Sequence, residues 1–138
     1  KPLALWLMQK NCTVTICQKS SSNLSTCIQQ ADLLIMAPGK RGLVQAKDLK
    51  PSACIIDVGI HHLSNGQICG DVDYLELQHH CAAITPVPGG VGPMTVWALM
   101  ENTFMAAKEH VVQLEAEENK QKSAKPAQAN LKNDHEAN

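Results

Sequence analysis

The chain has 138 residues, which is near the size of one domain, and 44% of them are hydrophobic. Only four residues are aromatic, so a core would have to be built from aliphatic side chains. The formal net charge of −1 gives no basic footprint for nucleic acid, and the absence of any run of about 18 apolar residues excludes an evident membrane span.

The first thirty residues predict a helix, a strand and a second helix. Residues 2–10 are typical of the back half of a helix, with Pro2 early in it. Residues 13–17, Thr-Val-Thr-Ile-Cys, are β-branched and alternating, which predicts a strand. A serine-rich turn follows, and residues 24–30 carry the apolar stripe of a short helix.

Three apolar segments in the middle of the chain predict buried strands. Residues 32–37 and 53–58 are continuous apolar runs stopped by Pro-Gly and by Gly, as in strands covered on both faces. Residues 63–68 contain Asn65-Gly66, a strong hairpin signal. Residues 73–80 are weakly helical, and residues 82–85 predict a last strand.

A long helix is predicted to begin at Pro93, because proline is favoured at a first helical position. One apolar face recurs at steps of three and four residues for about 20 residues. Its members are Trp97, Met100, Phe104, Ala107, Val111 and Leu114. From Glu115 the sequence is polar, so we expect residues 114–138 to be a helix end and a disordered tail.

Strands alternating with helices predict an α/β fold, with a Rossmann-like, mostly parallel sheet flanked by helices over residues 1–113. No Gly-x-Gly-x-x-Gly phosphate loop is present, so the domain is expected to lack its first strand and that loop. Strands 13–17 and 32–37 would then each lose a neighbour. The isolated chain is therefore predicted to be marginally stable or prone to aggregate.

The most informative run is residues 84–95, Ile-Thr-Pro-Val-Pro-Gly-Gly-Val-Gly-Pro-Met-Thr. Proline fixes φ, while glycine reaches positive φ and lets another surface come close. Such a loop has a definite shape and leaves N–H groups free at a helix start, where a polar or anionic ligand can bind. A plain strand-to-helix turn is the alternative, but it needs fewer glycines and prolines.

The run Thr85–Thr95 resembles the signature of the bifunctional methylenetetrahydrofolate dehydrogenase/methenyltetrahydrofolate cyclohydrolase family without a break. Weaker similarities occur in the family's order at 31–35, 50–53, 56–60 and 70–72. The resemblance covers residues 1 to about 113 and implies the NAD(P)-binding domain of such an enzyme. Lys1-Pro2 would match the end of the family's phosphate loop, so the chain is expected to be a piece of a longer protein.

The resemblance implies an enzyme that oxidises 5,10-methylenetetrahydrofolate with NADP⁺ and hydrolyses the product to 10-formyltetrahydrofolate. Its reactive Lys and Tyr lie in an N-terminal domain absent from this sequence, so no catalytic residue is assigned and the chain alone is expected to be inactive. The missing domain and a second copy, as a homodimer, are the implied protein partners. The compartment would be the cytoplasm or the mitochondrial matrix.

The resemblance also assigns binding residues. The loop would line the folate pocket with Pro86, Pro88, Gly89, Gly90, Val91, Gly92 and Pro93. Gly59 and Ile60 end a strand and would contact the nicotinamide dinucleotide, although His61 stands where the family usually has Asn. Thr95 could reach the cofactor or cap its helix.

The turn after residues 13–17 is where a Rossmann domain distinguishes NADP from NAD. It has no acidic residue, and Lys19 and Ser20 suit a 2′-phosphate, which favours NADP with NAD possible. A solvated polar turn explains the same residues, and the family often has His-Ser near Gln18-Lys19.

The six cysteines lack Cys-x-x-Cys spacing and are expected to be buried free thiols. The pairs His61-His62 and His79-His80 do not chelate well, because neighbouring side chains diverge, so no metal is expected. Two alternatives stay open: a non-catalytic module that has lost activity, and an unrelated Rossmann dehydrogenase or interaction domain.

Overall fold

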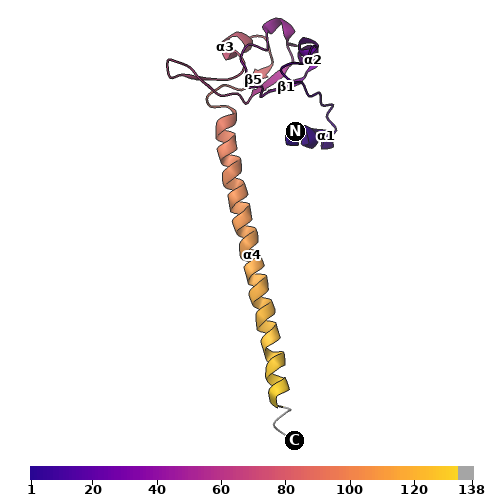
Figure 1. Cartoon of the computed structure of the whole chain (residues 1–138), viewed down its shortest axis with the longest axis vertical. Helices are drawn as coiled ribbons and strands as arrows, with labels where there is room; N and C mark the ends of the chain where they lie inside the picture. The colour runs from indigo at the N-terminus through magenta and orange to yellow at the C-terminus, as the bar shows by residue number, and fades with distance from the viewer. Residues whose placement is uncertain (134–138) are drawn as a thin grey trace. The chain divides into compact units, whose positions relative to one another are not determined.

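The computed structural model describes residues 1–133, and the side-chain surroundings of residues 1–123. The chain divides into two compact units, which are described separately. One unit spans Lys1–Met94, and the other begins at Thr95 and contains most of a long helix. Figure 1 shows the sheet-bearing unit with α2, α3, β1 and β5, together with the long helix α4.

The centre of the first unit is a parallel sheet of three strands, β1 (Leu33–Met36), β2 (Cys54–Asp57) and β5 (Ala83–Ile84). Their order is β1-β2-β5, with Leu33 opposite Cys54 and Cys54 opposite Ala83. All three strands were predicted from their apolar runs, and the mostly parallel α/β sheet is confirmed.

A two-stranded antiparallel hairpin, β3 (His61–His62) and β4 (Ile68–Cys69), follows β2. Gly66 in its turn has φ of 80°, and the Asn65 side chain accepts a 3.0 Å hydrogen bond from the Gln67 N–H. The hairpin predicted from Asn65-Gly66 is therefore confirmed, with its paired residues lying just to either side of the turn.

Short helices occupy the predicted places. They are α1 (Pro2–Gln9), α2 (Leu24–Gln30), the 3-10 helix η1 (Ala46–Asp48) and α3 (Tyr74–Leu77). The Asp73 carboxylate caps α3 by accepting a 3.2 Å bond from the Glu76 N–H. Only η1 was not anticipated.

The predicted strand at residues 13–17 does not form. In the described part of the chain this segment belongs to no sheet, and Ile16 is 69% exposed. A strand exists only as part of a hydrogen-bonded ladder, so β-branched composition is insufficient when no neighbouring strand is present. For the same reason β1 is an edge of the three-stranded sheet.

The long helix α4 (Val91–Asn133) differs from its prediction at its start. It begins two residues before Pro93, which is tolerated because N–H groups of a first turn have no helical partner. It is assigned through Asn133, and the disordered tail expected within residues 114–138 stays a prediction. Ala, Glu, Gln and Lys are good helix formers, and Lys122 lies 3.8 Å from Glu118 one turn earlier. Residues 134–138 of the predicted tail lie outside the described residues.

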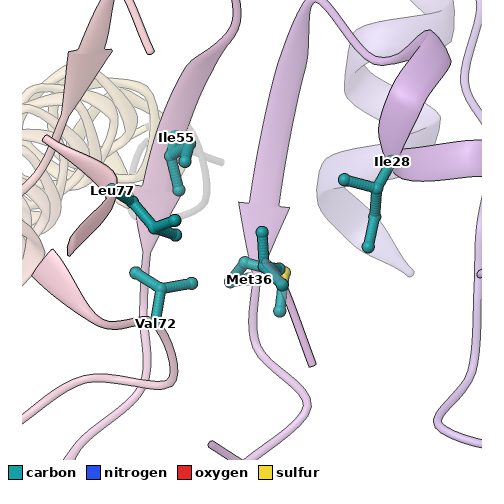
Figure 2. Close-up of a cluster of buried hydrophobic side chains, with 6 residues drawn as sticks. Ile28, Met36, Ile55, Val72 and Leu77 are labelled. Atoms are coloured by element: carbon teal, nitrogen blue, oxygen red, sulfur yellow. The ribbon is translucent and has the colours of Figure 1, made fainter. Parts of the chain in front are cut away.

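The core of the first unit is aliphatic, as the composition required. Figure 2 shows how Ile28 of α2, Met36 of β1 and Ile55 of β2 point into one cluster. Val72 and Leu77, from the segment around α3, complete it on the side of β2, and Val44 is also a member. Because this face of the sheet is covered by α2 and α3, the polar groups that matter lie at the strand ends.

Truncating Ile55 to valine should lower the free energy of unfolding of the first unit by about 1 kcal/mol, because this side chain is only 1% exposed. The exposed Ile16 offers a matched control, and Ile16→Val should change the same free energy by less than about 0.5 kcal/mol. Hydrogen exchange of the β2 amides measures both. Equal effects of the two substitutions would contradict the described core.

Candidate functional site

The carboxyl ends of the three parallel strands meet at one edge of the sheet. β1 leads into Ala37-Pro38-Gly39, β2 into Val58-Gly59-Ile60, and β5 into Thr85-Pro86. We call these three connections the strand-end crest. Ligands of open α/β sheets bind beyond the carboxyl ends of the strands, so a ligand-binding site is expected at the crest.

Asp57, the last residue of β2, organises the crest and is only 2% exposed. Its Oδ1 accepts hydrogen bonds from the N–H groups of Gly59 at 2.8 Å and Asp71 at 3.1 Å. Its Oδ2 accepts from the Val72 N–H at 3.0 Å. Its own N–H donates to the Thr85 hydroxyl at 2.8 Å. The buried carboxylate thus joins β2 to the segment after β4, and the backbone N–H of the same residue holds the start of the proline-glycine loop.

Asp71 is a second buried carboxylate and is fully enclosed. Its Oδ2 accepts a 2.9 Å bond from the Gly39 N–H, and its Oδ1 lies 2.7 Å from His61 Nε2. Asp71 therefore ties the connection after β1 to the hairpin. His61, the departure from the family pattern, has a buried charged partner, so its polar contact is satisfied within this chain.

Two glycines allow these carboxylates to come close to the backbone. A Cβ built on Gly59 would overlap the Asp71 side chain and lie 2.5 Å from the Asp71 nitrogen. A Cβ on Gly70 would overlap the Asp57 carboxylate. Gly59 is therefore required by the packing of the two aspartates, whatever the crest binds.

The proline-glycine loop follows β5 directly and contains a cis peptide bond between Val87 and Pro88. The three glycines of the loop differ in whether its backbone shape requires glycine. Gly89 has φ of 97°, and a Cβ on Gly90 would overlap the Pro86 carbonyl oxygen, so both are required by the shape of the loop. Gly92 has neither constraint, and a Cβ there would meet nothing within 4 Å. Gly92 leaves open backbone surface that the fold itself does not need.

The predicted cofactor residues lie in three places. Gly59 and Ile60 are on the crest, and the Ile60 side chain is 63% exposed. Lys19 and Ser20 are exposed in a turn closed by the Ser21 hydroxyl, which accepts a 2.9 Å bond from the Gln18 N–H. Thr95 is the fifth residue of α4.

A pocket of about 330 Å³ lies beside the crest. Asp57, Thr85 and Val87 form one side of it, and Arg41 and Tyr74 contribute from the loop after β1 and from α3. The sequence did not predict this pocket, because its lining comes from four separated segments. The one signal in the sequence was the family similarity at Gly70-Asp71-Val72, of which Gly70 and Val72 line the pocket.

The six cysteines are unpaired, as predicted, but they are not fully buried. Cys12 is exposed and the other five are half-buried. The neighbouring Cys27 thiol, and then burial, raise the pKa of Cys17 above its ordinary value. Burial, with a contribution from Cys54, raises the pKa of Cys81. Both thiols are therefore held in their protonated, weakly nucleophilic form near neutral pH.

A parallel α/β sheet whose connections leave from its carboxyl edge is the architecture of a Rossmann-like domain. Comparison with known proteins gives the family. Residues 1–111 match the family model described as tetrahydrofolate dehydrogenase/cyclohydrolase, NAD(P)-binding domain. The chain belongs to this family.

The relatives are bifunctional proteins named FolD. The chain is 50% identical over 109 residues to the one from Nitrosospira multiformis, covering 79% of this chain and 38% of that protein. It is 48% identical over 108 residues to the one from Polaromonas naphthalenivorans, covering 78% and 38%. The chain thus spans about two-fifths of the length of these curated relatives.

Solved structures show the same domain. The crystal structure of the bifunctional enzyme FolD from Campylobacter jejuni has a TM-score of 0.76 and 43% identity, over 79% of this chain and 39% of that one. The Trypanosoma brucei methylenetetrahydrofolate dehydrogenase-cyclohydrolase, complexed with NADP cofactor and inhibitor, has a TM-score of 0.73 and 34% identity, over 80% and 40%. The Rossmann-like assignment is confirmed.

Replacing Asp57 by asparagine should destabilise the first unit by about 1–3 kcal/mol, because an NH₂ group would face an N–H donor that now has an acceptor. Asp73→Asn is the matched control, since asparagine caps a helix about as well as aspartate does. A urea titration followed through the amide NMR signals of Gly59 and Val72 measures the difference. If both variants are equally stable, Asp57 does not organise the crest.

Proposed function

We propose that this chain is the cofactor-binding part of an enzyme that oxidises 5,10-methylenetetrahydrofolate to 5,10-methenyltetrahydrofolate with NADP⁺ and hydrolyses the product to 10-formyltetrahydrofolate. Membership of the family and the names of the relatives support this reaction pair. Because the chain spans only part of those relatives, the activity is proposed for a longer protein that contains it.

The observation that carries the proposal is the run Thr85–Thr95 at the strand-end crest. It keeps the family pattern, and Thr85 anchors it to the buried Asp57. The open backbone at Gly92 is suited to the close approach of a flat ring. We assign the folate wall to this loop, with residues Pro86, Pro88, Gly89, Gly90, Val91, Gly92 and Pro93.

The residues of this chain fit a nicotinamide dinucleotide at its two ends. Ile60 presents exposed apolar surface at the carboxyl end of the central strand, which suits a nicotinamide ring. Lys19 and Ser20 present a cation and a hydroxyl without a nearby acid, which suits a 2′-phosphate. When bound, the cofactor supplies the hydride acceptor, and this chain binds and orients it. Gly59 and Thr95 complete the proposed cofactor set.

No catalytic residue is assigned in this chain. The reactive groups are proposed to lie in the domain that occupies the rest of the relatives' length, and the domain present here is proposed to extend over residues 1–113. A homodimer is the proposed assembly, and the cytoplasm or the mitochondrial matrix is the proposed location. Among residues 1–133 no helix is both long and apolar enough to cross a membrane.

If Lys19 holds the 2′-phosphate, Lys19→Glu should raise the dissociation constant for NADP⁺ about tenfold or more, which corresponds to about 1.4 kcal/mol for one lost charge contact. The dissociation constant for NAD⁺, which lacks that phosphate, should change much less. Isothermal titration calorimetry of the longer protein that contains this chain, with each dinucleotide, measures both values.

Lys120→Glu is the control for that experiment, because it makes the same charge change at an exposed position of α4. It should leave both constants within about twofold, because a change in net charge alone, screened by salt, has little effect on binding. A loss of NADP⁺ binding that is equal for the two variants would show that Lys19 acts only through net charge.

The purified 138-residue chain should catalyse neither reaction, because the proposed reactive groups are not part of it. Absorbance assays for NADPH formation and for methenyltetrahydrofolate hydrolysis measure this directly. Turnover above that of a buffer blank would refute the assignment of the chemistry to another domain. Failure of the longer protein that contains this chain to bind NADP⁺ would instead favour a module that has lost its cofactor.

A further inference from the structure

The pocket beside the strand-end crest shares a wall with the proline-glycine loop, because Thr85, Pro86 and Val87 line it. Its volume of about 330 Å³ lies near the lower end of the range of about 300–1,000 Å³ that small-molecule sites occupy. Its aliphatic lining consists of Val72, Leu75, Pro86 and Val87. The pocket is therefore suited to a small ligand with an apolar body.

Among the described residues that line this pocket, Arg41 is the one base. Its guanidinium forms no hydrogen bond or ion pair with any residue that the structure describes, since the ion pairs there involve other side chains. The phenol hydroxyl of Tyr74, on the α3 side of the pocket, likewise has no hydrogen-bond partner in the described part of the chain. A guanidinium has only donors, so both groups have donors that a ligand can use.

The loop after β1 is attached to the crest two residues before Arg41. The Gly39 N–H donates a 2.9 Å hydrogen bond to the fully buried carboxylate of Asp71. Gly39 and Gly42 lie on either side of Arg41 in the sequence, with φ of 62° and 76°, a backbone conformation that favours glycine. The backbone that carries Arg41 is therefore anchored beside the pocket, although the side chain itself is exposed.

Two carboxylates also line the pocket, and both accept hydrogen bonds from the chain. Asp57 accepts three backbone N–H groups, and Asp73 accepts the Glu76 N–H as the cap of α3. Because these acids repel negative charge, a singly charged acid group is favoured over a doubly charged one such as phosphate. The guanidinium fork also matches a carboxylate, to which it donates two parallel hydrogen bonds. The charges of the pocket therefore select a carboxylate.

We propose that this pocket binds a small carboxylate with an apolar or aromatic body, whose acid group pairs with the Arg41 guanidinium. The body lies against the aliphatic lining, and the Tyr74 hydroxyl is a second donor for the acid group. Two sources share this chemistry. One is a free monocarboxylate, and the other is the p-aminobenzoylglutamate part of a folate bound on the adjoining proline-glycine loop. Only the second source rests on the proposed function.

Amide NMR titration of the longer protein that contains this chain tests the site, with benzoate as the probe and benzamide as its uncharged counterpart. Benzoate should shift the amide signals of Gly70 and Val72 saturably, because both residues line the pocket. Its dissociation constant should be at least about tenfold lower than that of benzamide, since only benzoate offers a charge to Arg41. Inorganic phosphate should bind more weakly than benzoate.

Three variants assign the binding to its charges. Arg41→Gln should raise the benzoate dissociation constant about tenfold, because it removes the cation and its fork. Lys40→Gln is the matched control, since it makes the same charge change at a neighbour that does not line the pocket, and should stay within about twofold. Asp73→Asn should lower the constant, because it removes a like charge while asparagine keeps the α3 cap. Unchanged amide signals of β2 show that each variant keeps the fold.

Competition distinguishes the two sources of the carboxylate. Displacement of benzoate by both p-aminobenzoyl-L-glutamate and 5,10-methenyltetrahydrofolate assigns the acid group to the folate, whereas benzoate binding that neither compound affects assigns it to a free acid. The proposal is overturned if benzoate causes no saturable shift, if benzamide binds equally well, or if Arg41→Gln and Lys40→Gln weaken binding equally. Loss of NADP⁺ binding or of turnover would contradict the proposed function and leave this site unaffected.

Discussion

The buried carboxylate of Asp57 is the interaction on which the rest of the sheet-bearing unit depends. It lies where the central strand ends, and its oxygens accept three backbone N–H groups from segments 2 to 15 residues further along the chain. Burying a carboxylate is costly unless it is fully hydrogen-bonded, and this one is. The same residue donates its own N–H to Thr85. The side chain of Asp57 therefore ties β2 to the segment after the hairpin, and its backbone N–H ties β2 to the loop.

These hydrogen bonds connect the strand-end crest although its strands are short. β5 has only two residues, too few to orient the following loop by its own ladder. The Thr85–Asp57 bond adds a contact at the point where the loop leaves the sheet. Asp71 extends the same network to Gly39 and His61, so all three crest connections share it. The crest is thus held by buried polar groups, while the aliphatic core holds the sheet below it.

Local signals predicted most elements. Apolar runs located the strands, and Asn65-Gly66 located the hairpin. Both features depend on residues that are neighbours in the sequence, so the sequence alone can indicate them. The prediction of a strand at residues 13–17 was wrong, because a strand depends on a partner strand elsewhere in the chain. The roles of Asp71 and Arg41 were also missed, since their contacts join residues far apart in sequence. The family resemblance supplied the proposed ligands of the loop, but only the structure separated Gly90, which the loop needs for its shape, from Gly92, which it does not.

The long helix of the second unit is stabilised differently from the sheet-bearing unit. Over residues 97–114 of α4 the apolar spacing is that of a heptad, whereas beyond Leu114 the helix has no apolar face and depends on propensity and neighbouring charges. A helix satisfies its own backbone groups, so helical structure can extend beyond the residues that have an apolar face. A helical segment of low hydrophobicity has little apolar surface that packing against another element could bury. The polar half of α4 therefore has little apolar surface to bury, whereas the exposed apolar side chains of the helix lie between residues 94 and 114.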